Sequence, residues 1–76
     1  MKAYVLINVK MGRVREVVKN LKRSEKVVEA SMTFGPYDAV ALVQFDNLDE
    51  LGNLLANVIQ PIPGVLETLT CLAADH

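Results

Sequence analysis

The chain of 76 residues has few of the side chains on which metal sites and nucleophilic catalysis usually depend. It has no tryptophan, its only cysteine is Cys71, and its only histidine is the final residue, His76. A single cysteine cannot form a disulfide within the chain or a multi-cysteine metal site, so we interpret it as a buried structural thiol. A zinc site or a histidine-based triad has no internal histidine to use. We therefore expect no metal site and no cofactor.

Long apolar runs are also missing. No uninterrupted apolar stretch approaches the roughly 20 residues of a membrane span, and Met1-Lys2-Ala3 leads into a strand-like run without a signal-peptide core. We expect a cytoplasmic protein without membrane contact. With 51% hydrophobic and 5% aromatic residues, the chain has more aliphatic side chains than so small a domain can bury alone. We predict one domain, residues 1–76, that associates with itself.

Positive charge is absent from most of the chain, because no lysine or arginine follows Lys26. Seven of the eight basic residues crowd into residues 10–26, and seven acidic residues follow them. The basic residues are Lys10, Arg13, Arg15, Lys19, Lys22, Arg23 and Lys26, and the acidic ones are Glu29, Asp38, Asp46, Asp49, Glu50, Glu67 and Asp75. The basic segment is either a solvated helix face or a contact with the acidic half of a neighbouring copy. We expect no direct nucleic-acid binding, since no aromatic residue alternates with these charges.

Hydrophobic periodicity predicts six elements in the order βαββαβ. The predicted strands are residues 3–9, 26–34, 37–45 and 65–74. The helices are residues 13–23 and a segment that begins at an Asn47 cap and ends before Pro61. This order is the split βαβ pattern of the ferredoxin-like α+β fold, in which both helices pack on one face of a four-stranded antiparallel sheet.

The same periodicity assigns side chains to faces. The first helix is expected to bury Val14, Val17, Val18 and Leu21, and the second Leu48, Leu51, Leu55, Val58 and Ile59. In the second strand, Val28, Ala30, Met32 and Phe34 form the apolar face. The sheet face away from the helices is expected to carry Tyr4, Leu6, Val27, Val40, Leu42 and Leu72 among Asn8, Ser31, Thr33, Thr68 and Thr70. That face is too apolar to leave in water, so we predict a homodimer that covers it.

Two short segments contain most of the residues that are not needed simply to form the fold. One is Gly35-Pro36-Tyr37-Asp38, and the other is Ile62-Pro63-Gly64-Val65 followed by Thr68-Leu69-Thr70. With the helix start Asn47-Leu48-Asp49-Glu50-Leu51, they resemble the C-terminal ligand-binding domain of the Lrp/AsnC (feast/famine) regulators, called RAM. The resemblance covers residues 2–74. Typical family members carry a helix-turn-helix before this domain, so the chain resembles the stand-alone form.

The resemblance implies a sensor of small amino acids rather than an enzyme. Such domains form dimers that assemble into octamers or decamers, bind effectors between dimers, and modulate transcription indirectly, alone or with full-length regulators of the family. On this interpretation Asp38 accepts the ammonium group, Gly35 lets backbone N–H groups approach the carboxylate, and Tyr37 walls the pocket. Thr68 and Thr70 complete the polar contacts. Glu67 stands where many relatives carry a basic residue.

Plainer interpretations remain for each of these residues. A Gly-Pro pair is commonly just a turn, Asp38 can simply cap it, and threonine is frequent in strands for propensity alone. The rival function is a small monooxygenase or isomerase that uses the cleft near Asp38, since dimeric ferredoxin-like barrels include such enzymes. Asp38 would then be a lone general base without a partner acid.

Overall fold

The computed structural model describes residues 1–74, and Asp75 and His76, which were considered above, lie outside the described part. The strands are β1 (Lys2–Val9), β2 (Val27–Met32), β3 (Ala39–Gln44) and β4 (Val65–Leu72). Helix α1 is Val14–Leu21, and helix α2 (Leu48–Leu54) continues directly into a π-helical turn, η1 (Leu55–Ile59). No helix within residues 1–74 is long and apolar enough to cross a membrane.

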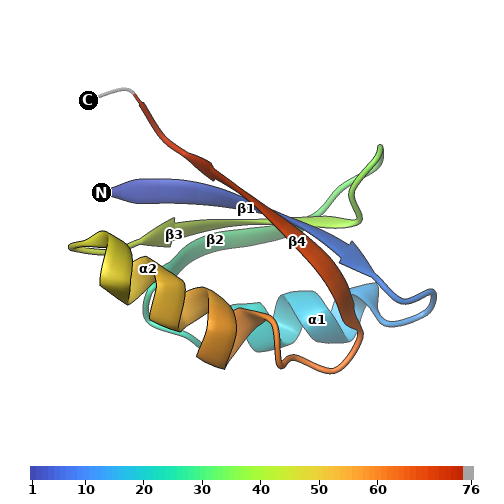
Figure 1. Ribbon diagram of the computed structural model, residues 1–76. Coiled ribbons are helices and arrows are strands. Elements are labelled where there is room, and N and C mark those ends of the chain that lie inside the picture. Colours follow the sequence, from blue (N-terminus) through green and yellow to red (C-terminus); the bar gives the residue numbers. More distant parts are fainter. Residues whose placement is uncertain (75–76) are drawn as a thin grey trace.

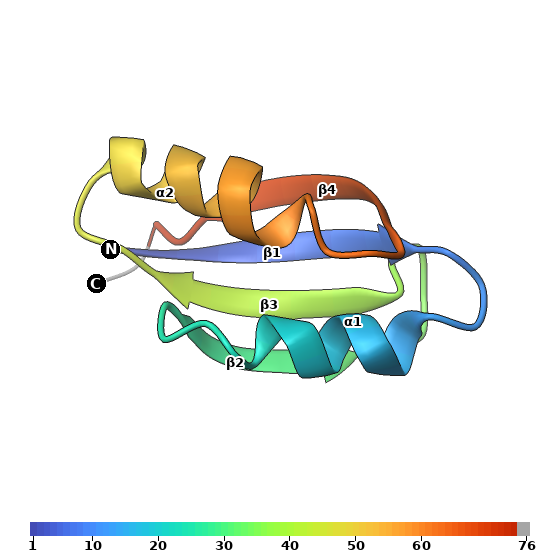
Figure 2. The ribbon, with the colours of Figure 1, turned by 90° about the horizontal axis from the view of Figure 1, so that it is seen from below.

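The four strands form one antiparallel sheet in the order β2-β3-β1-β4, and both helices cover the same face (Figure 1). Seen from the helix side, α1 lies beside β2 and β3, while α2 and η1 lie beside β1 and β4 (Figure 2). The opposite face carries no element of this chain, and we call it the open face. The predicted ferredoxin-like architecture is therefore confirmed.

The core lies between the sheet and the helices, as the alternation of residues predicted. Every second residue of β1 and β3 is buried there, and α1 adds three aliphatic side chains. The main contributors are Ala3, Val5, Ile7, Val9, Ala39, Ala41, Val43, Phe45, Val17, Val18 and Leu21. Each large aliphatic side chain buried in this way stabilises the fold by about 1.5–3 kcal/mol relative to exposure.

The N-terminus of α2 has the cap that the sequence predicted, in a modified form. The Asn47 side chain accepts a hydrogen bond from the Glu50 N–H at 2.8 Å. In a complete capping box the Glu50 carboxylate would accept from the Asn47 N–H, but it accepts instead from the Asp46 N–H at 3.4 Å and pairs with Lys26. The cap therefore also joins α2 to the segment before β2.

The buried face of the second helix differs from the prediction. Leu51, Leu54 and Ile59 are buried, whereas Leu48 is 58% exposed and Val58 is 38% exposed. For Val58 the cause is the π-helical turn, which the Gln60 N–H closes by donating to the Leu55 carbonyl five residues back at 2.9 Å. The wider turn brings Ile59, not Val58, onto the face that Leu54 occupies.

Strand β2 also departs from simple alternation. The register with β3 shifts between Val27 and Glu29, which places one extra residue in β2. Val27, predicted on the open face, packs against the core, while Val28, predicted to be buried, is exposed. The prediction for these two residues was wrong because a bulge reverses the alternation on one side of it.

Gly64 joins the start of β4 to the start of α1. It has a φ of +101°, and a Cβ atom there would lie 2.9 Å from Arg13 Cβ and 3.2 Å from Val17 Cγ2. Its carbonyl accepts a hydrogen bond from the Lys10 N–H at 2.7 Å. A glycine is required here both by the backbone conformation and by the close approach of α1.

We expect Gly64→Ala to lower the free energy of unfolding by about 2 kcal/mol, because alanine is strained at positive φ and overpacks the contact with Arg13. Urea unfolding at a fixed protein concentration measures this. Gly52→Ala is the matched control, since Gly52 lies inside α2 with nothing within 4 Å of an added Cβ. It should raise the stability by up to about 1 kcal/mol. Equal effects of the two substitutions would contradict the assignment.

Candidate functional site

The turn between β2 and β3 holds three of the predicted ligand-binding residues in a closed backbone arrangement. The Thr33 N–H donates to the Asp38 carbonyl at 3.0 Å, and the Thr33 hydroxyl donates to the Tyr37 carbonyl at 2.7 Å. Gly35 has a φ of +146°, in a region that other residues rarely adopt, and its Cβ position faces open space. The structure thus accounts for Gly35 through the turn itself and leaves room beside it.

Asp38 links this turn to the central strand. Its Oδ2 atom accepts a hydrogen bond from the Val9 N–H at 2.7 Å, and its own N–H donates to the Ile7 carbonyl at 2.9 Å. The side chain is half-buried and continues the β1–β3 pairing beyond Ala39. Within residues 1–74, its Oδ1 atom makes no hydrogen bond with another side chain or a backbone N–H. Asp38 therefore has a structural role at one oxygen and a free acceptor at the other.

Thr68 and Thr70 were predicted on the open face, and this was wrong. They pair with Ile7 and Val5, whose side chains are fully buried under the helices, so both threonines face the helix layer. The register between β1 and β4 shifts after Val65, where Leu66 is an extra residue. This bulge reverses the alternation for the rest of β4.

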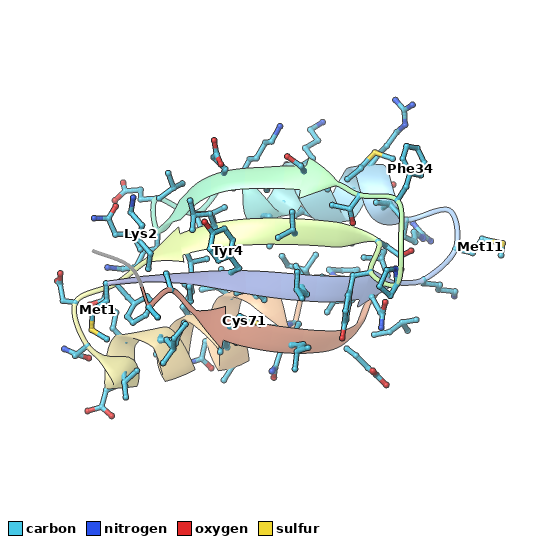
Figure 3. All side chains as sticks on the ribbon, turned by 90° about the horizontal axis from the view of Figure 1, so that it is seen from above. Met1, Lys2, Tyr4, Met11, Phe34 and Cys71 are labelled. Atoms are coloured by element: carbon cyan, nitrogen blue, oxygen red, sulfur yellow. The ribbon has the colours of Figure 1, made fainter. Side chains whose placement is uncertain are left out.

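The same bulge changes which residues of β4 reach the open face. Leu72, predicted there, pairs with Ala3 and lies on the helix side. Leu69 and Cys71 take its place, opposite Leu6 and Tyr4 respectively. Cys71 is exposed in the single chain, which corrects its interpretation as a buried thiol. Figure 3 looks onto this open face and labels Tyr4 and Cys71.

The open face has an apolar centre, with polar residues at its two ends and on β2. The polar residues that the register places on this face are Lys2, Asn8, Glu29, Ser31, Gln44 and Glu67. Leu69 is 49% exposed, and neighbouring strands contribute apolar side chains that are half-buried or exposed. These open-face residues are Tyr4, Leu6, Val40, Leu42, Leu69 and Cys71. Their position confirms that the sheet has a second apolar face, with a composition that differs at β4 from the predicted one.

A depression of about 400 Å³ lies where η1 ends and β4 begins. Thr68 lines it together with Gln60, Val65, Leu66 and Glu67. The Gln60 side-chain amide donates to the Thr68 hydroxyl at 3.4 Å. Gln60 was not among the predicted site residues, because a polar residue before two prolines resembles an ordinary loop residue.

The structure therefore divides the predicted ligand-binding residues into two groups. Gly35, Tyr37 and Asp38 share the β2–β3 turn, whereas Thr68 borders the depression beside Gln60. The lining of this depression does not include Gly35, Tyr37 or Asp38. Nor do residues 1–74 contain a group of three His, Cys, Asp or Glu side chains that could hold a metal ion.

Lys26 and Glu50 form an ion pair beside a second depression, of about 270 Å³, which also borders Asp46. The hydrogen bond between the two side chains is the main cause of two pKa shifts. It raises the pKa of Lys26 and lowers the pKa of Glu50 from their ordinary values. The pair ties the start of β2 to the first turn of α2.

These shifts predict a pH dependence with two limits. The lowered pKa of Glu50 means that its stabilisation is present above its ordinary pKa and is lost as the pH falls through the lowered value. The raised pKa of Lys26 means that its stabilisation is lost as the pH rises through the raised value. Glu50→Gln should therefore lower the Tm at neutral pH, with a deficit that vanishes in acid. Asp49→Asn is the control, because it removes a carboxylate from the same helical turn that forms no ion pair within residues 1–74. An equal loss of Tm at neutral pH in both variants would contradict the role of the Lys26–Glu50 pair.

Asp38 offers a separate test of its structural role. Asp38→Ala leaves the Val9 N–H without its acceptor, and we expect a loss of about 1–3 kcal/mol in the free energy of unfolding. Asp38→Asn keeps an acceptor oxygen at the same position and should cost much less. Chemical denaturation of the two variants checks this, and similar losses for both would contradict the role of the hydrogen bond.

Comparison with known proteins agrees with this fold. The profile of the Lrp/AsnC ligand binding domain matches residues 2–75. The chain belongs to this family. It is 42% identical over 72 residues to the HTH-type transcriptional regulator FL11 of Pyrococcus abyssi, which covers 95% of this chain and 47% of the relative. The chain thus spans about half the length of the curated relatives that it matches.

Solved structures give the same result. TTHA0845 from Thermus thermophilus superposes with a TM-score of 0.92 at 33% identity, covering 99% of this Lrp/AsnC-type chain and 94% of the other. E. coli AsnC superposes with a TM-score of 0.93 at 25% identity, covering 99% of this chain and 51% of AsnC. The curated relatives that the chain matches are HTH-type transcriptional regulators.

Proposed function

We propose that this domain is an effector sensor of the Lrp/AsnC type. It forms a homodimer through the open face, binds a small amino acid where dimers meet, and modulates transcription indirectly through its state of assembly. Family membership and the uncovered apolar face support this proposal. The open face is the observation on which it chiefly depends.

A second copy of the chain can cover the open face by packing its own open face against it. Tyr4, Leu6, Leu42 and Leu69 lie on adjacent strands, so their exposed apolar surface is continuous. Covering it contributes about 25 cal/mol for each Å² removed from water. A two-fold contact pairs this face with itself and leaves the helix layers of both copies on the outside.

The separation of the two predicted groups supports a ligand site shared between copies. The β2–β3 turn offers the free Oδ1 atom of Asp38 and the open space beside Gly35, and β4 offers the Thr68 hydroxyl and the Gln60 amide. One amino acid would contact both groups where the turn of one dimer approaches the depression of another. Asp38 would then accept the ammonium group, as a carboxylate is well suited to do.

Such a site couples binding to assembly. A ligand that binds only between dimers stabilises the larger assembly by RT ln(1 + [L]/Kd) and shifts the population towards it. Transcription then responds through contacts with full-length regulators of the family or through the assembly itself. No covalent step is required.

The test combines an amino-acid screen with the mass of the assembly in solution. We expect at least one of the common amino acids to raise the Tm of the wild-type chain, which should be dimeric or larger at micromolar concentration. Leu69→Glu places a charge on the open face and should give monomers that no longer respond to the amino acid. Asp38→Asn should stay dimeric and lose the response.

Leu48→Glu is the matched control, because Leu48 is similarly exposed but lies on α2, away from the open face. It should remain dimeric. A wild-type monomer at micromolar concentration, or an intact Leu69→Glu dimer, would refute the proposed dimer. A dimer that no amino acid stabilises would refute the sensing role alone.

A further inference from the structure

Phe34 is fully exposed (103%), which is unusual for a phenylalanine in a closed turn. The alternation of residues predicted Phe34 on the apolar face of a strand. In the structure β2 ends at Met32, and the Phe34 ring projects beyond the end of this strand (Figure 3). The hydrogen bonds of Thr33 to Tyr37 and Asp38 hold the backbone around it. Exposure forgoes the roughly 1.5–3 kcal/mol that burial of such a side chain contributes. The turn thus presents an aromatic side chain that nothing in its own chain covers.

An apolar depression of about 150 Å³ lies at the other end of the molecule, between the α1–β2 connection and the second helix. Leu54 and Val58 form its apolar wall, and the π-helical turn is what directs Val58 outward. Ser24, Asn53 and the Lys26–Glu50 pair complete the lining. A cavity of about this size can hold a benzene ring.

We call the exposed Phe34 side chain the knob. The knob and this depression cannot contact each other within one copy. Residues Thr33 and Asp38 close one end of the β2–β3 pair, while the Gln44 N–H bonds to the Lys26 carbonyl at the other end. The turn and the α1–β2 connection accordingly lie at opposite ends of the sheet (Figure 2). An occupant for the depression must therefore come from another molecule.

We propose that Phe34 of one copy inserts into the depression between Leu54 and Val58 of a neighbouring copy. The fit rests on size, on the apolar wall, and on the Lys26 ammonium group at the border, which is attracted to the face of an aromatic ring. Because the knob and the depression are different surfaces, the contact is heterologous and propagates from copy to copy until it closes into a ring.

The area involved assigns this contact to assemblies of dimers. A phenylalanine buries at most about 150–250 Å², whereas a stable interface needs roughly 1,000 Å² or more. One insertion cannot hold two single chains together. Two copies joined through the open face carry two knobs and two depressions, so several weak contacts act together. This inference therefore rests on the dimer proposed above.

The experiment measures assembly mass by light scattering or native mass spectrometry over a range of concentrations, without amino acid. Phe34→Ser should remain dimeric where the wild type forms larger assemblies, with the concentration for assembly raised roughly tenfold or more. Met11→Ser is the matched control, because Met11 is 96% exposed in the β1–α1 connection and lies outside both surfaces. It should assemble like the wild type.

Val58→Glu tests the depression, because it places a charge in the apolar wall that would receive Phe34. It should weaken the assembly of dimers as Phe34→Ser does. The double variant should assemble no more weakly than either single one, because both remove the same contact. If Val58→Glu does not fold, Asn53→Trp fills the depression from an exposed position and replaces it.

Three results would overturn the inference: a wild type that never exceeds a dimer, normal assembly of Phe34→Ser, or additive effects in the double variant. In the last two cases the proposed function stays intact, since dimers still meet through another contact. A wild type that never exceeds a dimer, even with an amino acid bound, would also refute the ligand site between dimers. A wild-type monomer would instead refute both.

Discussion

Strand β1 lies in the interior of the sheet, and its hydrogen bonds to β3 on one side and β4 on the other hold the remaining elements in place. One of its faces is almost entirely aliphatic and buried beneath both helices. Its C-terminal end is secured twice, by the Asp38 carboxylate at Val9 and by the Gly64 carbonyl at Lys10. Both candidate ligand-binding regions are therefore attached to the same end of one strand.

This attachment matters for a sensor. The β2–β3 turn reaches β1 through Asp38, and the depression on β4 reaches it through the pairing of Thr68 with Ile7. A ligand that contacts either region acts on backbone that is already hydrogen-bonded to the central strand. The response proposed here is consequently a change in how rigid copies associate, rather than a rearrangement within one copy.

The two faces of the sheet explain why we propose that this small domain associates with itself. The helix layer covers one face, and the open face retains a continuous apolar surface. Phe34 and the depression at Val58 are two further uncovered apolar features, and they lie at opposite ends of the molecule. The proposed symmetric contact on the open face and the proposed directional contact between the ends would together produce a closed assembly of dimers.

Local patterns were sufficient for the element order, the buried faces of β1, β3 and α1, and the Asn47 cap. Each depends on side chains a few residues apart, whose spacing is visible in the sequence. Most of the errors share one cause, which is a change of backbone phase. Extra residues at Val28 and Leu66 reverse strand alternation, and the π-helical turn directs Val58 outward. No residue type in these segments marks such a shift.

The sequence alone determined the ferredoxin-like order of elements, the family motif around Gly35 and Asp38, and the excess of apolar surface. Only the tertiary structure decided that Thr68 faces the helix layer, that one Asp38 oxygen is already occupied, and that Phe34 has no cover. The physical reason is that a bulge or a π-turn is selected by the hydrogen bonds and packing of partner strands and helices. Those partners are distant in the chain, so their choice is settled only when the fold is complete.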